Sequence, residues 1–171
     1  MSVPSLVLVG LGSNLPRRQK SSAVVVVEAM RLLQTFARDL LVESSLYRTS
    51  PVDCPAESAE FINAAVAFAP RNGLTAQGLL GELKSLERTY GRGRASVRNA
   101  PRVLDLDVLA FGDLVLDTPK FILPHPRATQ RAFVMIPLNE IVPDFVWPGT
   151  SATVAELCAN LVSDEQVVQI A

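Results

Sequence analysis

The pattern of apolar and polar residues along the chain predicts strands separated by helices. Four short segments are rich in apolar and β-branched residues, a composition that is typical of strands. These segments span residues 6–10, 40–49, 60–69 and 103–111. After the last of them, Gly112 and Asp113 predict a hairpin turn into a further strand at residues 114–116.

Two longer segments have apolar residues near helical spacing. The first helix is expected to begin at a cap on Ser21 or Ser22, and the second is expected to begin at Thr75 and end at Gly91. Two shorter helices are predicted near residues 134–141 and 153–161. The predicted core stripes are Val26, Met30, Leu33 and Ala37 in the first helix, and Leu79, Leu83, Leu86 and Tyr90 in the second.

The resulting order, β-α-β-β-α-β followed by a hairpin, is that of the split βαβ arrangement. We therefore predict an α+β fold of the ferredoxin-like type, with helices packed on one face of an antiparallel sheet. A C-terminal hairpin and short helices complete it. A chain of 171 residues, 49% of them hydrophobic, can bury one core, so we expect a single domain over residues 1–171.

The charges of the chain nearly cancel. Its 16 lysine and arginine residues and 17 aspartate and glutamate residues leave a net charge of -1, which gives no overall field for nucleic acid or an anionic membrane. The apolar run at residues 6–11 is too short to span a membrane, and Cys54 and Cys158 lack metal-ligand spacing. We expect a cytoplasmic monomer that binds small molecules, without nucleic-acid or membrane partners.

The strongest candidate for chemistry is a pair of aspartates in the segment at residues 103–111. Strand alternation places Asp105 and Asp107 on one face, roughly 6 to 7 Å apart, where their negative charges repel each other. Mg²⁺ with open positions for water and phosphate would relieve this repulsion. A solvated sheet face with salt bridges to arginine is the alternative.

A basic segment that contains glycines precedes the aspartates. Arginine binds phosphate oxygens through two parallel hydrogen bonds, and Gly91 and Gly93 allow the backbone to fold over a ligand. We interpret the segment as a lid over a metal-bound triphosphate; a nucleic-acid patch or a solvated loop is the alternative. The arginines are Arg88, Arg92, Arg94, Arg98 and Arg102.

Three further features each have two interpretations. His125, the only histidine, lies between prolines and is compatible with a fixed phosphate donor or with a structural role. Phe61 and Phe133 are core candidates unless they stack on a ligand. Residues 10–14 resemble half of a dinucleotide fingerprint, but the third glycine is missing and the chain contains no P-loop sequence.

The segment from Arg98 to Leu109, in which Pro101-Arg102 precedes the paired aspartates, resembles the signature of the hydroxymethyldihydropterin pyrophosphokinase family. Further similar segments lie at residues 12–15, 47–51, 61–66, 123–125 and 131–133, and the resemblance covers about residues 6–148. It implies two Mg²⁺ ions on Asp105 and Asp107, and catalytic lid arginines at Arg92 and Arg102. It also implies ATP contacts at Glu87, Arg94, Lys120, His125 and Arg131, and pterin contacts at Thr49, Ser50, Val52, Phe61, Asn63 and Phe133.

The reaction that this resemblance implies is transfer of diphosphate from the co-substrate ATP to the hydroxymethyl group of 6-hydroxymethyl-7,8-dihydropterin, in folate biosynthesis. Asn99 and Lys120 stand where some relatives carry tryptophan and arginine. A catalytically impaired paralogue that senses pterin or nucleotide is therefore one alternative. An RNA-binding ferredoxin-like domain is another, although the strand of interest carries carboxylates rather than exposed aromatics.

Overall fold

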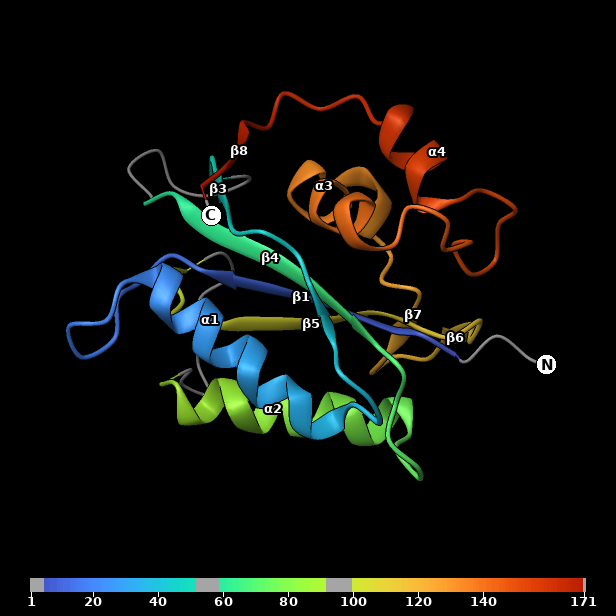
Figure 1. The fold of residues 1–171 in the computed structure, drawn as a ribbon, viewed down its shortest axis with the longest axis horizontal. Helices are drawn as coiled ribbons and strands as arrows, with labels where there is room; N and C mark the ends of the chain where they lie inside the picture. Colours follow the sequence, from blue (N-terminus) through green and yellow to red (C-terminus); the bar gives the residue numbers. More distant parts are fainter. Residues whose placement is uncertain (1–4, 52–58, 92–99, 171) are drawn as a thin grey trace.

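A computed structural model of the chain describes residues 5–51, 59–91 and 100–170. Its helices and strands lie close to the predicted positions (Figure 1). The strands are β1 (Val7–Ser13), β2 (Val42–Glu43), β3 (Tyr47–Thr49), β4 (Phe61–Phe68), β5 (Asp105–Phe111), β6 (Leu116–Asp117), β7 (Ile122–Leu123) and β8 (Val167–Gln169). The helices are α1 (Ser22–Leu33), α2 (Ala76–Thr89), α3 (Ala132–Ile141) and α4 (Val154–Ala159), with short 3-10 helices at Gln34–Phe36 and Ala128–Gln130.

One antiparallel sheet organises these elements. Its strand order is β5-β1-β4-β3-β8, and β2 also pairs with β4. β1 therefore lies between β5 and β4, and its apolar side chains are buried on both faces of the sheet. A strand that is buried on both faces needs a continuous apolar sequence, which is the pattern at residues 6–10.

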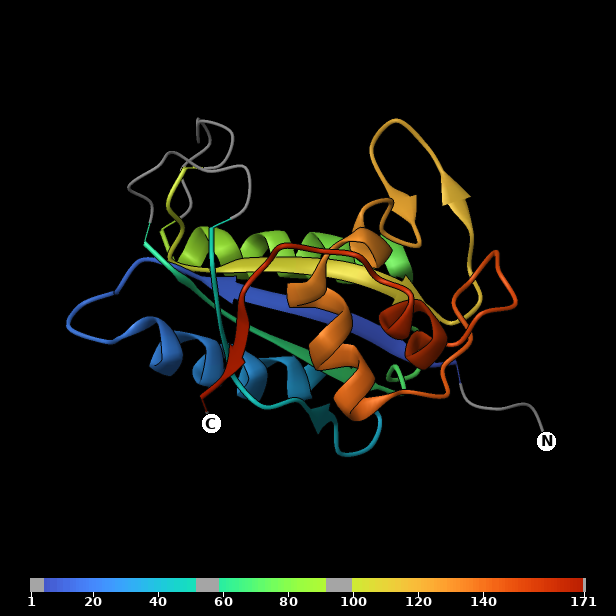
Figure 2. The same ribbon diagram turned by 90° about the horizontal axis from the view of Figure 1, so that it is seen from above.

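Helices cover both faces of this sheet, which corrects the prediction that they pack on one face. α1 and α2 lie on one side, and α3 and α4 lie on the other (Figures 1 and 2). Val7 and Val9 of β1 belong to the cluster on the α1 and α2 side, whereas Leu8 packs in the cluster that contains Met135 of α3. The side chains of β1 thus contribute to two cores, in agreement with its continuous apolar sequence.

The predicted starts of the two long helices are confirmed by their caps. Ser21 Oγ accepts a hydrogen bond from the Val24 amide at 3.4 Å, and Thr75 Oγ1 accepts one from the Gly78 amide at 3.0 Å. Gly91 follows α2 with a φ of 100°, a left-handed conformation that commonly ends helices at glycine. Within the described ranges, no helix combines the length and apolarity needed to cross a membrane.

The hairpin predicted at Gly112 and Asp113 is wrong in position. β6 pairs with β7 rather than with β5. The reason is a turn farther along the chain, where the backbones of Thr118 and Phe121 donate hydrogen bonds to each other at 3.2 and 3.3 Å. The predicted strand at residues 40–49 is likewise divided into β2 and β3.

β5 contains an extra residue in its pairing with β1. Leu8 pairs with Ala110 and Val9 pairs with Val108, so Leu109 forms a β-bulge between them. The alternation of the strand therefore changes at this point, and Ala110 packs on the α3 side instead of the side expected from strict alternation. Asp105 and Asp107 precede the bulge and keep their common face.

Candidate active site

A pocket of about 220 Å³ lies over β1, β4 and β5, on the side of the sheet that α3 covers. Gly10 and Gly12 of β1 form part of its floor and pair across the sheet with Asp107 and Asp105. Because glycine carries no side chain, the space beside the two carboxylates stays open to a ligand. Two glycines that are two residues apart in an apolar strand indicate an open sheet surface at this point. Comparing them only with a dinucleotide-binding fingerprint does not predict this surface.

The two aspartates at the start of β5 both line this pocket. Burial, followed by the negative charge of Asp105, raises the pKa of Asp107 to about 6. The cations of Lys84, Arg131 and Arg102 oppose this shift only in part. Burial and the neighbouring carboxylate therefore disfavour the ionised form of Asp107, and a bound cation would favour it.

The donor set fits a magnesium ion that is shared with a phosphate ligand. Mg²⁺ is usually held by one or two carboxylates, and substrate phosphates and water complete its coordination. In the described part of the chain, no three histidine, cysteine, aspartate or glutamate side chains are grouped to enclose a metal on their own. Asp105 and Asp107 could therefore supply part of a coordination shell that phosphate oxygens and water would complete.

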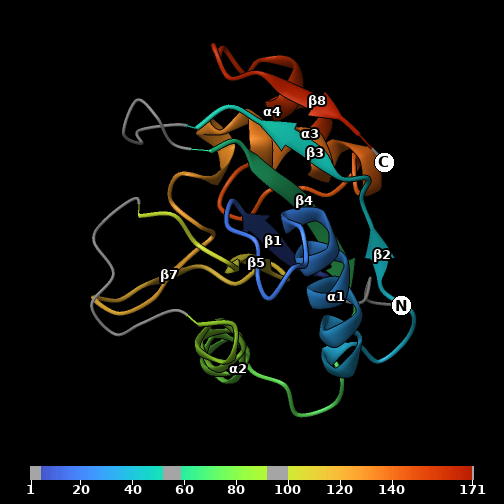
Figure 3. The same ribbon diagram turned by 90° about the vertical axis from the view of Figure 1, so that its left-hand side faces the viewer.

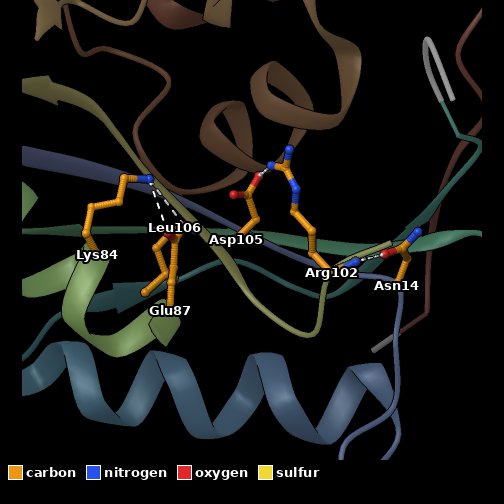
Figure 4. A network of polar contacts seen from close by, with 6 residues as sticks. All are labelled: Asn14, Lys84, Glu87, Arg102, Asp105 and Leu106. Carbon is orange, nitrogen blue, oxygen red and sulfur yellow. Dashed lines mark hydrogen bonds and ion pairs between the residues drawn. The ribbon is translucent and has the colours of Figure 1, made fainter. Parts of the chain in front are cut away.

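Arg102 is fixed beside the carboxylates by the residue that follows β1. Asn14 Oδ1 accepts a hydrogen bond from the Arg102 amide at 2.7 Å, and the Asn14 amide donates to the Arg102 carbonyl at 3.0 Å (Figure 4). The Arg102 guanidinium donates through Nη1 to Asp105 Oδ2 at 3.0 Å. Its buried Nε has no acceptor among the described residues, and an unpaired guanidinium N–H beside a pocket suits an anion.

A basic wall faces the carboxylates from the segment that follows β7. The His125 amide donates to the carbonyl of Leu109, the bulge residue, at 2.8 Å. His125 Nδ1 accepts from the Arg127 amide at 3.2 Å, so the ring proton resides on Nε2. Burial, with the positive charges of Arg131 and Arg127, lowers the pKa of His125 and keeps the ring neutral at pH 7. Sequence reasoning assigned no role to Arg127, although it lies two residues from His125.

A third wall combines aromatic and polar side chains. Phe61 of β4 and Phe133 of α3 line the pocket together with Ser50, Thr49 and Asn63. Asn63 Nδ2 donates to Thr49 Oγ1 at 2.6 Å, and both side chains are buried, with exposed fractions of 6% and 1%. Fixed polar groups beside aromatic rings are typical of sites that orient a flat heterocycle.

The structure brings most of the predicted site residues into this one pocket. Glu87 and Lys120 do not line it: Lys120 is exposed in the turn between β6 and β7, and Glu87 is buried beneath β5. Val52, Arg92 and Arg94 lie outside the described residues, as does Asn99. The predicted site residues that line the pocket are Thr49, Ser50, Phe61, Asn63, Arg102, Asp105, Asp107, His125, Arg131 and Phe133.

Glu87 of α2 contacts the backbone of the carboxylate strand. It is 1% exposed, and its Oε1 accepts a hydrogen bond from the Leu106 amide at 2.8 Å (Figure 4). Lys84 Nζ lies 3.2 Å from Glu87 Oε2. Because β5 is at the edge of the sheet, Glu87 accepts from an amide that no neighbouring strand reaches. Glu87 thus holds the strand between its two aspartates, a role that differs from the adenosine contact expected for it.

We expect Glu87→Ala to lower the free energy of unfolding by about 2 kcal/mol, because it leaves a buried amide and the Lys84 ammonium without this acceptor. Glu87→Gln, which retains a carbonyl oxygen, should lose less. Urea unfolding measures both, with the exposed Glu82→Ala on the same helix as the control. Equal stability of Glu87→Ala and Glu82→Ala would contradict this role.

The chain was compared with known proteins. Residues 8–143 match the family described as 7,8-dihydro-6-hydroxymethylpterin-pyrophosphokinase. The 2-amino-4-hydroxy-6-hydroxymethyldihydropteridine pyrophosphokinase of Pseudomonas aeruginosa is 40% identical over 144 residues, which cover 83% of each chain. The enzyme of the same name from Methylorubrum extorquens is 38% identical over 152 residues, covering 89% of this chain and 90% of the relative.

Longer proteins contain a similar region. A folate synthesis bifunctional protein of Arabidopsis thaliana is 37% identical over 139 residues, and this chain spans only 23% of its length. The crystal structure of Plasmodium falciparum HPPK-DHPS has a similar fold, with a TM-score of 0.68 at 13% identity, over 91% of this chain and 44% of that one. The extent of the family match and the identity to the two bacterial enzymes lead to one conclusion: the chain belongs to the 7,8-dihydro-6-hydroxymethylpterin-pyrophosphokinase family.

Proposed function

We propose that the chain transfers diphosphate from ATP to the hydroxymethyl group of 6-hydroxymethyl-7,8-dihydropterin, giving AMP and the pterin diphosphate. The observation that supports this proposal is that three groups of side chains, which form three walls, line one pocket. Carboxylates suited to a metal, a basic wall suited to phosphates and an aromatic and amide wall suited to a pterin all line the same space. Membership of the family is consistent with this reaction.

The pterin is proposed to lie between Phe61 and Phe133. Stacking on two aromatic rings fixes the plane of a heterocycle, and fixed amide and hydroxyl groups at its edge set its rotation. Asn63, oriented by Thr49, and Ser50 are the edge contacts within the described residues. Val52 is a further pterin contact by resemblance.

The triphosphate of ATP is proposed to lie between the carboxylates and the basic wall. Asp105 and Asp107 would hold two Mg²⁺ ions, which when bound neutralise phosphate oxygens and favour attack on phosphorus. His125 would donate through Nε2–H to a phosphate oxygen without adding charge, while Arg131 and Arg102 bind through charge-assisted hydrogen bonds. Arg127 adds a cation that lines the same wall. Arg92 and Arg94 are proposed for the lid.

In the proposed reaction the hydroxymethyl oxygen attacks the β-phosphorus of ATP. The bond from that phosphorus to the α–β bridging oxygen breaks, AMP leaves with the electron pair, and the hydroxyl proton passes to solvent or to a phosphate oxygen. The protein contributes alignment and charge, which account for most of the catalysis in phosphoryl transfer. The Arg102 guanidinium, from a residue that lines the pocket, is proposed to compensate charge on the transferring group.

We further propose that the core is the ferredoxin-like split βαβ arrangement within a single domain over residues 1–171. The order β5-β1-β4-β3, with α1 and α2 as the two crossovers, supports this assignment. The layer of α3 and α4 is an addition to that arrangement.

Phosphorus NMR of the protein with ATP, Mg²⁺ and 6-hydroxymethyl-7,8-dihydropterin tests the function. We expect AMP and a pterin diphosphate to form together. ADP as the product would show γ-transfer and contradict the proposal. Pterin binding without turnover would instead support the alternative, a catalytically impaired paralogue that senses pterin or nucleotide.

A further inference from the structure

The C-terminal segment at residues 165–169 lies beyond the part of the chain that matches the family, which ends at residue 143. β8 within this segment pairs with β3 at the edge of the sheet, with Val167 opposite Thr49 (Figure 3). The chain reaches this edge by passing from α4 along α3 (Figure 2). The segment therefore lies next to two walls of the pocket at once.

One contact of this segment is with the first turn of α3. The residue that precedes this helix, Arg131, makes no side-chain capping bond, although its carbonyl accepts a hydrogen bond from the Val134 amide at 3.1 Å. Glu165 Oε2 accepts a hydrogen bond from the Phe133 amide at 3.0 Å. A carboxylate at the amino end of a helix is also favoured by the helix dipole, so Glu165 caps α3 from a distant part of the sequence.

The next residue makes the second contact, on the opposite wall. The Gln166 amide donates to Ser50 Oγ at 3.1 Å, and the Ser50 amide donates to the Gln166 carbonyl at 3.1 Å. Ser50 and Phe133 both line the pocket. Two adjacent residues of the C-terminal segment thus connect the end of β3 with the start of α3.

We propose that Glu165 is a positioning residue of the pterin site, which holds the Phe133 end of α3 at a fixed place relative to Ser50 and the end of β3. The identity of the ligand rests on the proposed function. Loss of the Glu165 bond frees the start of α3, so the ring of Phe133 is no longer held over the pterin plane. The cost falls on pterin binding more than on ATP binding, because Arg131 is the one proposed ATP contact that adjoins the start of α3, whereas the proposed metal ligands Asp105 and Asp107 are on β5.

The test compares Glu165→Ala and Glu165→Gln with the wild-type protein. In a titration with 6-hydroxymethyl-7,8-dihydropterin, in the presence of Mg²⁺ and a non-hydrolysable ATP analogue, Glu165→Ala should raise the pterin Kd about tenfold, equivalent to about 1.4 kcal/mol. The KM for ATP should change less than about threefold. Glu165→Gln, which retains an acceptor oxygen, should recover most of the affinity, and the adjacent exposed Asp164→Ala is the matched control.

Hydrogen exchange at the Phe133 amide gives a readout that does not depend on the ligand. Exchange should be faster in Glu165→Ala than in the wild type and unchanged in Asp164→Ala. Unchanged exchange, or a wild-type pterin Kd in Glu165→Ala, would overturn the inference, even if the variant melts at a lower temperature. A wild-type protein that binds no pterin would instead contradict the proposed function, and Phe133 exchange would still decide whether Glu165 holds α3.

Discussion

Replacing Asp107 with asparagine is expected to reduce AMP formation by about 10³-fold or more and, without metal, to make the folded protein more stable at pH 7. The first effect follows from the loss of a proposed metal ligand. The second follows from electrostatics, because Asp107 is partly buried next to Asp105 and its pKa is raised to about 6. Activity and stability should therefore change in opposite directions.

The sign of the stability effect follows from proton linkage. A carboxyl group whose folded pKa is about 6, against an ordinary value of 3.8, holds its proton more tightly in the folded state than in the unfolded state. The stability that this tighter proton binding contributes is complete below pH 4 and is lost as the pH rises through about 6. A shift of this size corresponds to roughly 3 kcal/mol, and asparagine, which does not ionise, avoids the loss.

Urea unfolding of the EDTA-treated protein between pH 4 and pH 8 measures this effect, and phosphorus NMR measures turnover. The metal-free wild type should lose stability relative to Asp107→Asn as the pH rises through about 6, and Mg²⁺ at pH 7 should restore the wild type more than the variant. Asp113→Asn, in the exposed turn after β5, is the control and should change neither property. Near-normal turnover of Asp107→Asn, or lower stability than the wild type at pH 7, would remove Asp107 from the proposed metal site.

The second large effect is expected at the floor of the pocket, where Gly12→Ala should weaken pterin binding about 100-fold. A Cβ atom at Gly12 would lie 2.7 Å from Asn63 Oδ1, which is closer than non-bonded atoms approach. Asn63 would have to move and break its 2.6 Å hydrogen bond to Thr49 Oγ1. A displacement of about 1 Å in a positioning group is sufficient for an effect of this size.

Gly10→Ala is a matched control for this variant. Gly10 lies two residues away on the same face of β1, but a Cβ atom there would lie 3.4 Å from Leu109 Cδ1, an ordinary contact distance. Pterin titration should therefore give a smaller increase in Kd for Gly10→Ala than for Gly12→Ala, because a Cβ atom at Gly10 does not displace Asn63. Equal losses in both variants would mean that the floor tolerates no side chain at all, and that Asn63 is not the reason for glycine at position 12.

Local patterns in the sequence predict most of the sheet and both long helices, because strand alternation and helix caps depend on residues that are close together along the chain. They fail where a distant partner decides the outcome. The Glu87 carboxylate looks like one of many charged groups on an amphipathic helix until the Leu106 amide at the sheet edge is placed beside it. The second helical layer depends on Leu8 and Ala110 facing α3, and a single-residue bulge sets the side of Ala110.

The candidate site was predictable to a larger extent than the layers around it. The common face of Asp105 and Asp107 follows from strand alternation, which left metal binding and a solvated face as alternatives. The pterin residues Phe61 and Phe133 were assigned only through the family resemblance. Asn14, Arg127 and Glu165 have no local signal that separates them from ordinary polar residues. The bonds of Asn14 and Glu165 to the backbone amides of Arg102 and Phe133, and the bond of the Arg127 amide to the His125 ring, exist only in the folded chain.

The bulge at Leu109 has a consequence for how the chain can vary in length. The carbonyl of the bulge residue accepts the hydrogen bond from the His125 amide, so one strand carries the two acidic groups and also anchors the imidazole opposite them. Deleting this single residue would regularise the pairing with β1 and would also remove the attachment point of the histidine segment. Insertions and deletions should therefore be better tolerated in the turn between β6 and β7 than within β5. The length of β5 fixes the spacing between the two carboxylates and the imidazole of His125.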